Sequence, residues 1–304
     1  MIETVSRNFF MKLANNQPLN KAARKWGLNF GASKVVAGAT IDSAIETVRS
    51  LNNDGIQATL DHLGEFVYTR EEAASATDYC VRTLKAIAEA DVKSGLSIKL
   101  TQLGLDIDPN FCLANTKKIL DTAKAAGRFV RIDMEDSGHC QATIDMLKDL
   151  RRTYDNVGTV IQAYLMRSLN DVKGLKGVPL RIVKGAYKES PDIAYQDKKD
   201  IDANYLKMVK THLLNGSYTA IATHDHRIIA DVKTFIQEHQ IPRDRFEFQM
   251  LYGMRRPLWH ELVKEGYKMR IYVPFGNDWF GYYMRRLAER PQNVSFAFRG
   301  LFSK

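Results

Sequence analysis

Short apolar runs rich in β-branched and aromatic residues recur along the chain from about residue 56, and amphipathic stretches separate them. Runs of this length and composition are typical of strands that are buried on both faces. The pattern predicts eight strands, at residues 56–60, 96–100, 128–133, 157–163, 179–184, 218–223, 245–250 and 268–273.

The stretches between these runs are predicted to be helices. Helical spacing of apolar residues is clear at Ala114, Ile119, Leu120 and Ala123. Two stretches open with start signals: Asp108-Pro109 precedes one, and Thr69 with Glu72 three residues later precedes another. Eight strands alternating with about eight helices predict an α/β fold of the (βα)8, TIM-barrel type. The alternative is a doubly wound open sheet, which normally has about six strands.

Residues 1–50 lack this alternation and contain helix-forming segments broken at glycines. We interpret them as an N-terminal helical arm that packs on a barrel of residues 51–304. The sequence contains no low-complexity linker, so residues 1–304 are predicted to form a single domain.

The composition is that of an ordinary globular protein, with 45% hydrophobic and 26% charged residues. The three cysteines form no metal-binding pair, which favours reduced thiols. No signal-peptide pattern and no run of ~18 apolar residues is present, so a cytoplasmic protein is expected. The net charge of +9 suits an anionic ligand, nucleic acid or an anionic membrane surface without selecting among them.

Polar residues gather where the predicted strands end, and barrel enzymes carry their ligand sites at those ends. They are Asp61, His62, Lys99, Asp133, Glu135, Asp136, Gln162, Arg181, Lys184, Tyr187, Thr223, His224, Asp225, His226, Gln249 and Tyr272. Arg181 and Lys184 are the most informative, because cations in an apolar strand are rare unless they are paired or liganded. Lys99 alone would fit a side chain that reaches water, and Asp133 alone would fit a helix cap.

The segment Tyr282–Glu289 places Tyr282, Arg285, Arg286 and Glu289 on one side of a predicted helix. Two adjacent guanidinium groups suit a carboxylate ligand. Glu289, four residues after Arg285, can hold that side chain in place. An ordinary surface ion pair is the alternative, but the neighbouring aromatic residues argue against a fully solvated face.

Five strings in order along the chain resemble the short, monofunctional bacterial form of the proline dehydrogenase family. They are RIDMED at 131–136, RIVKGAY at 181–187, ATH at 222–224, FEFQML at 246–251 and YxxRRxxE at 282–289. The resemblance covers nearly the whole chain. It implies FAD lying across the carboxyl face of a (βα)8 barrel, and the absence of a GxGxxG loop disfavours a Rossmann-type site.

The resemblance also assigns roles to individual residues. It implies that FAD contacts Met134, Gln162, Arg181, Lys184, Gly185, Ala186, Thr223 and His224, with Gln249 a weaker candidate near the nucleotide half. It implies that Lys99, Arg285 and Arg286 bind the substrate carboxylate and that Tyr187 and Tyr272 flank the proline ring. Asp133 would support the pocket and, with Arg181, form the catalytic pair, while Glu289 would orient the arginines from a C-terminal helix over the site.

The implied reaction is oxidation of L-proline to Δ1-pyrroline-5-carboxylate, the first step of proline degradation to glutamate, by hydride transfer to flavin N5. A quinone is the implied electron acceptor, which leaves open a peripheral contact with the inner face of the membrane. The sequence does not fix the acceptor, the oxygen reactivity, the oligomeric state or the selectivity against hydroxyproline.

Three other functions are weighed against this one. A Schiff-base aldolase would use Lys99 or Lys184 as its nucleophile. A metal-dependent hydrolase would use His224, His226 and the Asp61-His62 pair, although these histidines lack a third ligand cluster. A nucleic-acid binder is disfavoured because the basic residues are dispersed and no binding motif is present.

Overall fold

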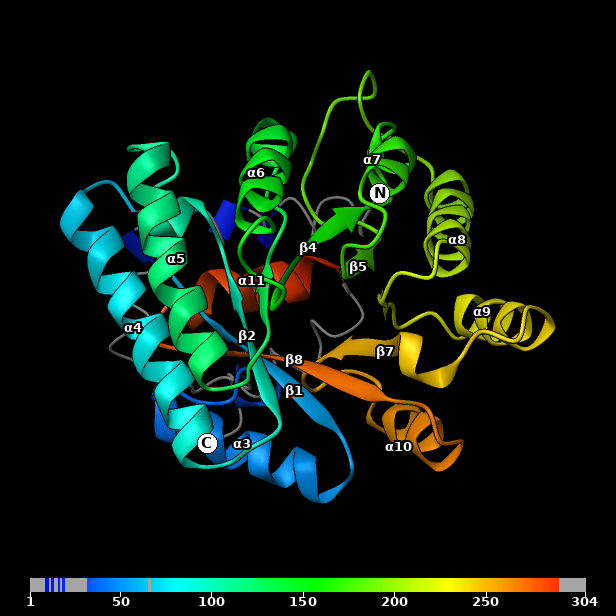
Figure 1. Cartoon of the computed structure of the whole chain (residues 1–304), viewed down its shortest axis with the longest axis horizontal. Coiled ribbons are helices and arrows are strands. Elements are labelled where there is room, and N and C mark those ends of the chain that lie inside the picture. Colours follow the sequence, from blue (N-terminus) through cyan, green and yellow to red (C-terminus); the bar gives the residue numbers. More distant parts are fainter. Residues whose placement is uncertain are drawn as a thin grey trace.

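The computed structural model describes residues 9–10, 12–13, 16, 18–19, 32–64 and 67–289, without the side chains of residues 288 and 289. Eight parallel strands close a barrel in sequence order, with β1 paired to β8 (Figure 1). The strands are β1 Gln57–His62, β2 Ser94–Ile98, β3 Val130–Ile132, β4 Val157–Gln162, β5 Leu180–Val183, β6 Thr219–Ala222, β7 Phe246–Leu251 and β8 Met269–Phe275. Every predicted run overlaps one of these strands, so the (βα)8 prediction is confirmed and the open sheet is excluded.

Helices surround the barrel (Figure 1). The α-helices are α3 Ile41–Asn53, α4 Arg70–Glu89, α5 Pro109–Ala125, α6 Ser137–Leu150, α7 Ser168–Gly174, α8 Lys198–Leu214, α9 His226–Glu238, α10 Arg256–Lys264 and α11 Trp279–Glu289, and the 3-10 helices are η2 Ala32–Lys34, η3 Thr101–Leu103 and η4 Arg243–Arg245. The predicted start signals are confirmed. Thr69 forms a capping box with Glu72. The side chain of Asp108, which precedes Pro109, accepts the backbone N–H groups of Asn110 and Phe111.

The helix that follows β8 does not join the outer ring. The eighth position of the outer ring, beside β1 and β8, is filled by α3, which includes residues 41–50 of the predicted arm. Three residues separate the carboxyl end of β8 from α11, which lies across the middle of the molecule in the view of Figure 1. Its aromatic residues pack against Ala32, Val36 and Leu63 in a second hydrophobic cluster. Most of the arm before residue 32 lies outside the described residues.

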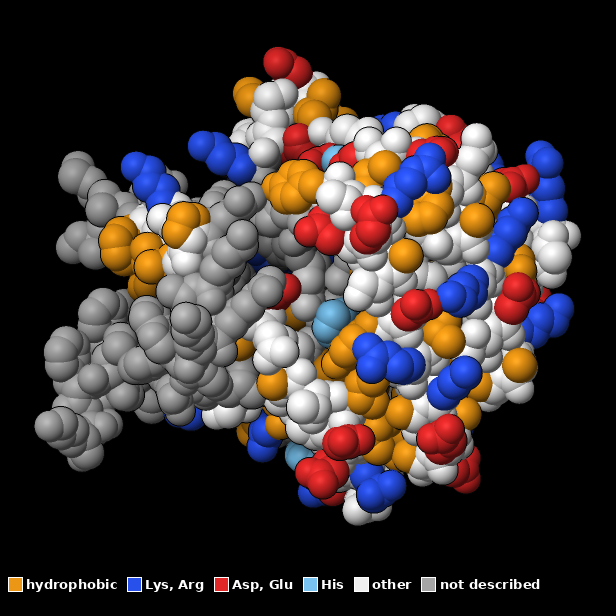
Figure 2. Space-filling view, turned by 90° about the vertical axis from the view of Figure 1, so that its left-hand side faces the viewer, with side chains coloured by type: hydrophobic (Ala, Val, Ile, Leu, Met, Phe, Trp, Pro, Cys, Tyr) orange, Lys and Arg blue, Asp and Glu red, His pale blue; other side chains and the backbone are white. Residues whose placement is uncertain are grey.

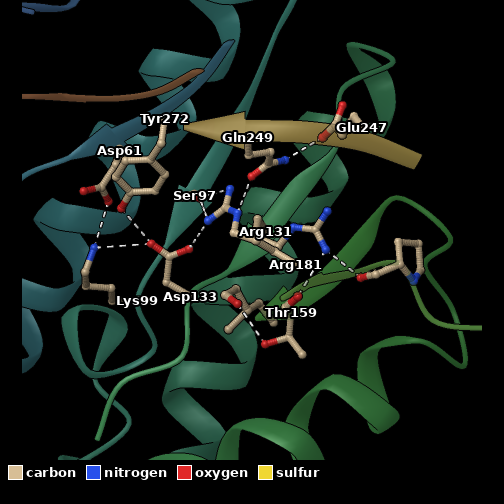
Figure 3. Close-up of polar contacts among 12 residues, drawn as sticks. Asp61, Ser97, Lys99, Arg131, Asp133, Thr159, Arg181, Glu247, Gln249 and Tyr272 are labelled. Atoms are coloured by element: carbon tan, nitrogen blue, oxygen red, sulfur yellow. Dashed lines mark hydrogen bonds and ion pairs between the residues drawn. The ribbon is translucent and has the colours of Figure 1, made fainter. Parts of the chain in front are cut away.

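The barrel interior is unusually polar. Side chains alternate along a strand, so Ile132, Ile182 and Ile271 face the helices while their neighbours face inward. Arg181 of β5 reaches both β2 and β7, which is possible only through the interior. The inward-facing polar side chains form a hydrogen-bonded network along the barrel axis (Figure 3). This network positions the candidate site at the carboxyl end.

Candidate active site

Asp133 is the junction of the site. It follows β3 directly, and its carboxylate is almost completely buried. Oδ1 accepts a hydrogen bond from Arg181 at 2.9 Å, and Oδ2 accepts one from the Tyr272 hydroxyl at 2.8 Å (Figure 3). The Lys99 ammonium lies 3.6 Å from the same Oδ2. One carboxylate therefore joins side chains from three other strands of the barrel wall.

Lys99 lies at the carboxyl end of β2 between two aspartates. Its Nζ donates to Asp61 Oδ1 at 2.9 Å, and Asp61 is itself buried. Burial by itself lowers the pKa of Lys99, but Asp61 and Asp133 outweigh burial and raise the pKa above its ordinary value. Lys99 is therefore a permanently charged group at this mouth of the barrel.

Arg181 is held on every side by the barrel interior. Its Nε donates to Gln249 Oε1 at 2.6 Å, and both terminal nitrogens lie 3.4 Å from the Ser97 hydroxyl. The guanidinium carbon lies 5.2 Å from the centre of the Tyr272 ring. Together with the Asp133 ion pair, these contacts fix a buried planar cation in one orientation.

The loop after β5 carries a second group of predicted residues. Lys184 pairs with Asp202 at 2.5 Å and with Asp225 at 3.3 Å. Gly185 has a φ of +110°, and a Cβ there would overlap the Tyr164 ring. Only glycine fits this turn. Ala186 and Tyr187 follow, and Tyr187 is 41% exposed.

The remaining predicted cofactor residues lie at the same ends of neighbouring strands. Met134 follows Asp133 and is buried. Gln162 ends β4 and donates through Nε2 to the Glu135 carbonyl oxygen at 2.8 Å. Thr223 accepts the backbone N–H of Asp225, and His224 Nε2 accepts the backbone N–H of Leu251. Gln249 instead points into the barrel toward Arg181.

The predicted arginine pair lies on α11. Arg285 and Arg286 are both half-buried, and the Arg286 guanidinium lies 5.1 Å from the centre of the Tyr282 ring. Trp279, Phe280 and Tyr283 are buried, which excludes a fully solvated helix face. The Glu289 side chain lies outside the described residues, so its role stays a prediction.

Sequence reasoning missed part of the interior network. Ser97, Glu247 and Arg270 belong to it, and Arg131 lies beside it and donates to the Thr159 carbonyl oxygen at 3.1 Å. Figure 3 labels these residues except Arg270, which donates to Glu247 Oε1 at 2.8 Å. The sequence does contain a signal for this network. Polar residues recur with the two-residue period of a strand whose inner face is polar, at Gln57, Thr59 and Asp61 in β1 and at Glu247 and Gln249 in β7.

Next to the site, His139 gives α6 a pH-dependent anchor. Its two ring nitrogens lie 2.6 Å from Asp136 and 2.9 Å from Asp106. Burial lowers the pKa of His139, but the aspartates outweigh it and raise the pKa above 6.5. The stabilisation that such a histidine contributes is fully present below about pH 6.5, and it is lost as the pH rises through the pKa of the folded protein.

We expect His139→Gln to lower the thermal midpoint by about 2 °C at pH 5.5 and to have little effect at pH 9.

Differential scanning calorimetry at the two pH values measures this difference. His260→Gln, at an exposed histidine of α10, is the matched control and should change neither midpoint. If His139→Gln lowers the thermal midpoint equally at both pH values, the ion pairs of His139 contribute nothing to stability.

The geometry weakens the alternative functions. Lys99 is a poor Schiff-base nucleophile because its two carboxylates keep it protonated. His62 stacks on Tyr79 at 3.9 Å between ring centres, and His224 is occupied by a backbone N–H. No group of three metal-ligating side chains occurs among the described residues. On the face shown in Figure 2, basic and acidic side chains are interspersed, unlike a nucleic-acid interface.

Within the described part of the chain, no helix is long and apolar enough to cross a membrane.

The fold and the site define a (βα)8-barrel enzyme with a buried site of paired charges at the carboxyl ends of its strands. The family profile described as proline dehydrogenase matches residues 44–299. Proline dehydrogenase 2 of Bacillus subtilis strain 168 is 50% identical over 99% of this chain and 100% of that protein. The proline dehydrogenase of Deinococcus radiodurans is 41% identical, with 99% of each chain covered. The chain belongs to the proline dehydrogenase family, which places it among enzymes that oxidise proline.

Solved structures agree with this assignment. The barrel resembles proline utilization A from Bdellovibrio bacteriovorus, with a TM-score of 0.80 and 28% identity over 90% of this chain. The match covers 34% of that protein, so the chain spans about a third of its length.

Proposed function

We propose that the protein is an FAD-dependent dehydrogenase that oxidises L-proline to Δ1-pyrroline-5-carboxylate. One observation carries the proposal. Asp133 contacts Lys99 and Tyr272, the candidate substrate residues, and also Arg181, the candidate cofactor residue. A single carboxylate can therefore hold the substrate groups and the cofactor group in one fixed arrangement, which is what a hydride transfer between two bound molecules requires.

The substrate side of this arrangement supplies positive charge and aromatic surface. Lys99, Arg285 and Arg286 would bind the proline carboxylate, and Lys99 stays charged because of its two aspartates. Tyr272, held by Asp133, would pack on one side of the proline ring, and Tyr187 would cover the other. These contacts orient the ring carbon beside the nitrogen, which is the atom that loses hydride.

The cofactor side has the donor set that a flavin dinucleotide needs. Arg181 and Lys184 are cations at the same mouth, and Gln162 and Thr223 add neutral hydrogen-bonding groups. Met134, Gly185, Ala186 and His224 would complete the contacts, with Gln249 acting on Arg181. FAD, when bound, supplies the N5 acceptor for the hydride. The Asp133 ion pair orients the Arg181 guanidinium, and a cation held in this way would stabilise negative charge on a bound flavin.

The electron acceptor is proposed to be a quinone, and the support for this is the family resemblance alone. A soluble quinone added with proline should be reduced at the rate at which proline is consumed. If only one-electron dyes are reduced, the quinone proposal is wrong while proline oxidation stands.

The proposed reaction is tested by incubating the purified protein with ¹³C-labelled L-proline and a dye acceptor. NMR should show loss of the proline signals and appearance of an imine carbon, with dye reduction in equal amount. Dye reduction without the imine signal would overturn the proposed substrate chemistry.

The arginine pair gives a separate prediction. We expect Arg285→Ala or Arg286→Ala to raise KM for proline at least tenfold, equivalent to ~1.4 kcal/mol, because each removes a cation from the carboxylate site. Steady-state kinetics measure the effect. Arg152→Ala, which removes an exposed arginine at a 3.5 Å surface ion pair, is the control and should leave KM unchanged. Unchanged KM in both α11 variants would remove the pair from the proposed site.

A further inference from the structure

Glu247 is a buried carboxylate on β7 that the proposed reaction does not use. It is 2% exposed and lies inside the barrel. Its Oε1 accepts hydrogen bonds from Arg270 Nε at 2.8 Å and from Gln249 Nε2 at 2.5 Å (Figure 3 shows the second). Burial by itself raises the pKa of Glu247, but Arg270, Gln249 and Arg131 outweigh it and hold the pKa below its ordinary value. The group is therefore an anion that can only accept hydrogen bonds.

This anion fixes which way the amide of Gln249 points. The amide nitrogen must face Glu247, so the amide oxygen faces the other way, where it accepts the Arg181 Nε–H at 2.6 Å. In the opposite orientation two N–H donors would meet at Arg181, and an amide oxygen would meet a carboxylate. Both contacts are repulsive, so only one orientation is stable.

The chain of hydrogen bonds continues away from the site. Arg270 donates to the Ala58 carbonyl oxygen at 2.8 Å and also to the Gln57 side chain, both on β1. Glu247 is thus anchored at the amino end of the barrel, and through Gln249 it reaches the cation at the carboxyl end.

We infer that Glu247 is a positioning residue that fixes Arg181 through the amide of Gln249. The inference rests on the proposed function, in which Arg181 acts beside the cofactor. Asp133 and Ser97 hold the terminal nitrogens of Arg181, and only Gln249 holds Nε among the described contacts. Loss of the Nε contact would let the guanidinium plane turn about its remaining partners.

The position of Glu247 predicts an effect on turnover and not on substrate affinity. Among the described contacts, Glu247 bonds Arg270 and Gln249 and none of the residues proposed to bind the proline carboxylate. In Glu247→Gln, the new amide can turn its NH2 toward Gln249, and Gln249 is then free to turn its own NH2 toward Arg181. We expect kcat to fall about tenfold while KM changes less than about twofold.

A second readout does not depend on activity. The Nε–H signal of Arg181 in ¹⁵N NMR of the holoenzyme, assigned by its loss in Arg181→Lys, reports the contact directly. We expect its exchange with water to be at least tenfold faster in Glu247→Gln than in the wild type. Glu261→Gln, at an exposed glutamate of α10, is the matched control and should change neither kcat nor the signal.

The double variant Glu247→Gln with Gln249→Glu tests the same idea if Glu247→Gln fails to fold. It again places a donor opposite an acceptor at each step, because the new Gln can accept from Arg270 through its oxygen and donate through its NH2 to the new Glu, which can accept from Arg181 Nε. We expect the Arg181 signal to regain its slow exchange.

The outcomes separate the two proposals. A fast-exchanging Arg181 signal in Glu247→Gln, and slow exchange in the double variant, support the positioning role whether or not proline is oxidised. Unchanged exchange and kcat in a folded Glu247→Gln, or fast exchange in the folded double variant, would overturn it. A wild-type protein that does not oxidise proline overturns the proposed function and leaves the Arg181 measurement valid.

Discussion

Replacing Asp133 with asparagine is expected to lower kcat/KM for proline by about 100-fold, which corresponds to ~2.7 kcal/mol. The carboxylate accepts from Arg181 at 2.9 Å and from Tyr272 at 2.8 Å, and it lies 3.6 Å from the Lys99 ammonium. Hydrogen bonds to charged groups are each worth about 1.5–3 kcal/mol. Asparagine keeps the shape of the side chain but removes the charge, so Lys99 and Arg181 both lose a counter-ion. Both kcat and KM should change, because Asp133 contacts the candidate substrate residues and also the candidate cofactor residue.

Asp136→Asn is the matched control for this variant. Asp136 lies three residues further along the chain, caps α6 and bonds His139, without contacting Lys99, Arg181 or Tyr272 among the described contacts. It should cost some stability and leave kcat/KM close to the wild-type value. If the two variants lose activity equally, the contacts of Asp133 with Lys99, Arg181 and Tyr272 are not what activity depends on.

Replacing Lys99 with methionine is expected to raise KM about 100-fold and to lower the free energy of unfolding by about 3 kcal/mol. The first effect follows from loss of a cation at the carboxylate site. The second follows because Asp61 is 2% exposed and would be left as a buried charge without its cation. The pKa of Lys99 is raised, so the lysine stays charged and both effects should persist from pH 6 to pH 9.

Lys85→Met, at an exposed lysine of α4, is the control for this second prediction and should change neither quantity. Lys99→Arg keeps the charge and should recover most of the stability. Equal KM values for Lys99→Met and the wild type would place the substrate carboxylate elsewhere.

The strand positions could be predicted from the sequence because burial on both faces leaves a continuous apolar run. The predicted and observed strand ends differ by at most two residues. Residues 128–133 were predicted as a strand, but β3 ends at Ile132, and Asp133 lies just beyond it with its side chain turned into the site. Polar residues at a strand end are thus a better guide to the site than the strand limits themselves.

The polar inner face has a sequence signal, but the partners within the interior network could not be predicted because their contacts cross the barrel. Arg181 and Ser97 are 84 residues apart, and their approach depends on the register of every strand between them. The position of α3 in the outer ring of helices could not be predicted either. Its apolar face is compatible with packing on a barrel wall or within a separate arm, and only closure of β1 onto β8 distinguishes the two.

An anaerobic absorbance titration of the purified protein with L-proline tests the central claim most directly. The account predicts a yellow protein whose flavin band bleaches when proline is added and remains unchanged when D-proline or glycine is added. A protein that binds flavin and does not bleach with L-proline would contradict the proposed substrate. A colourless protein that cannot be reconstituted with FAD would contradict the proposed cofactor and the hydride transfer built on it.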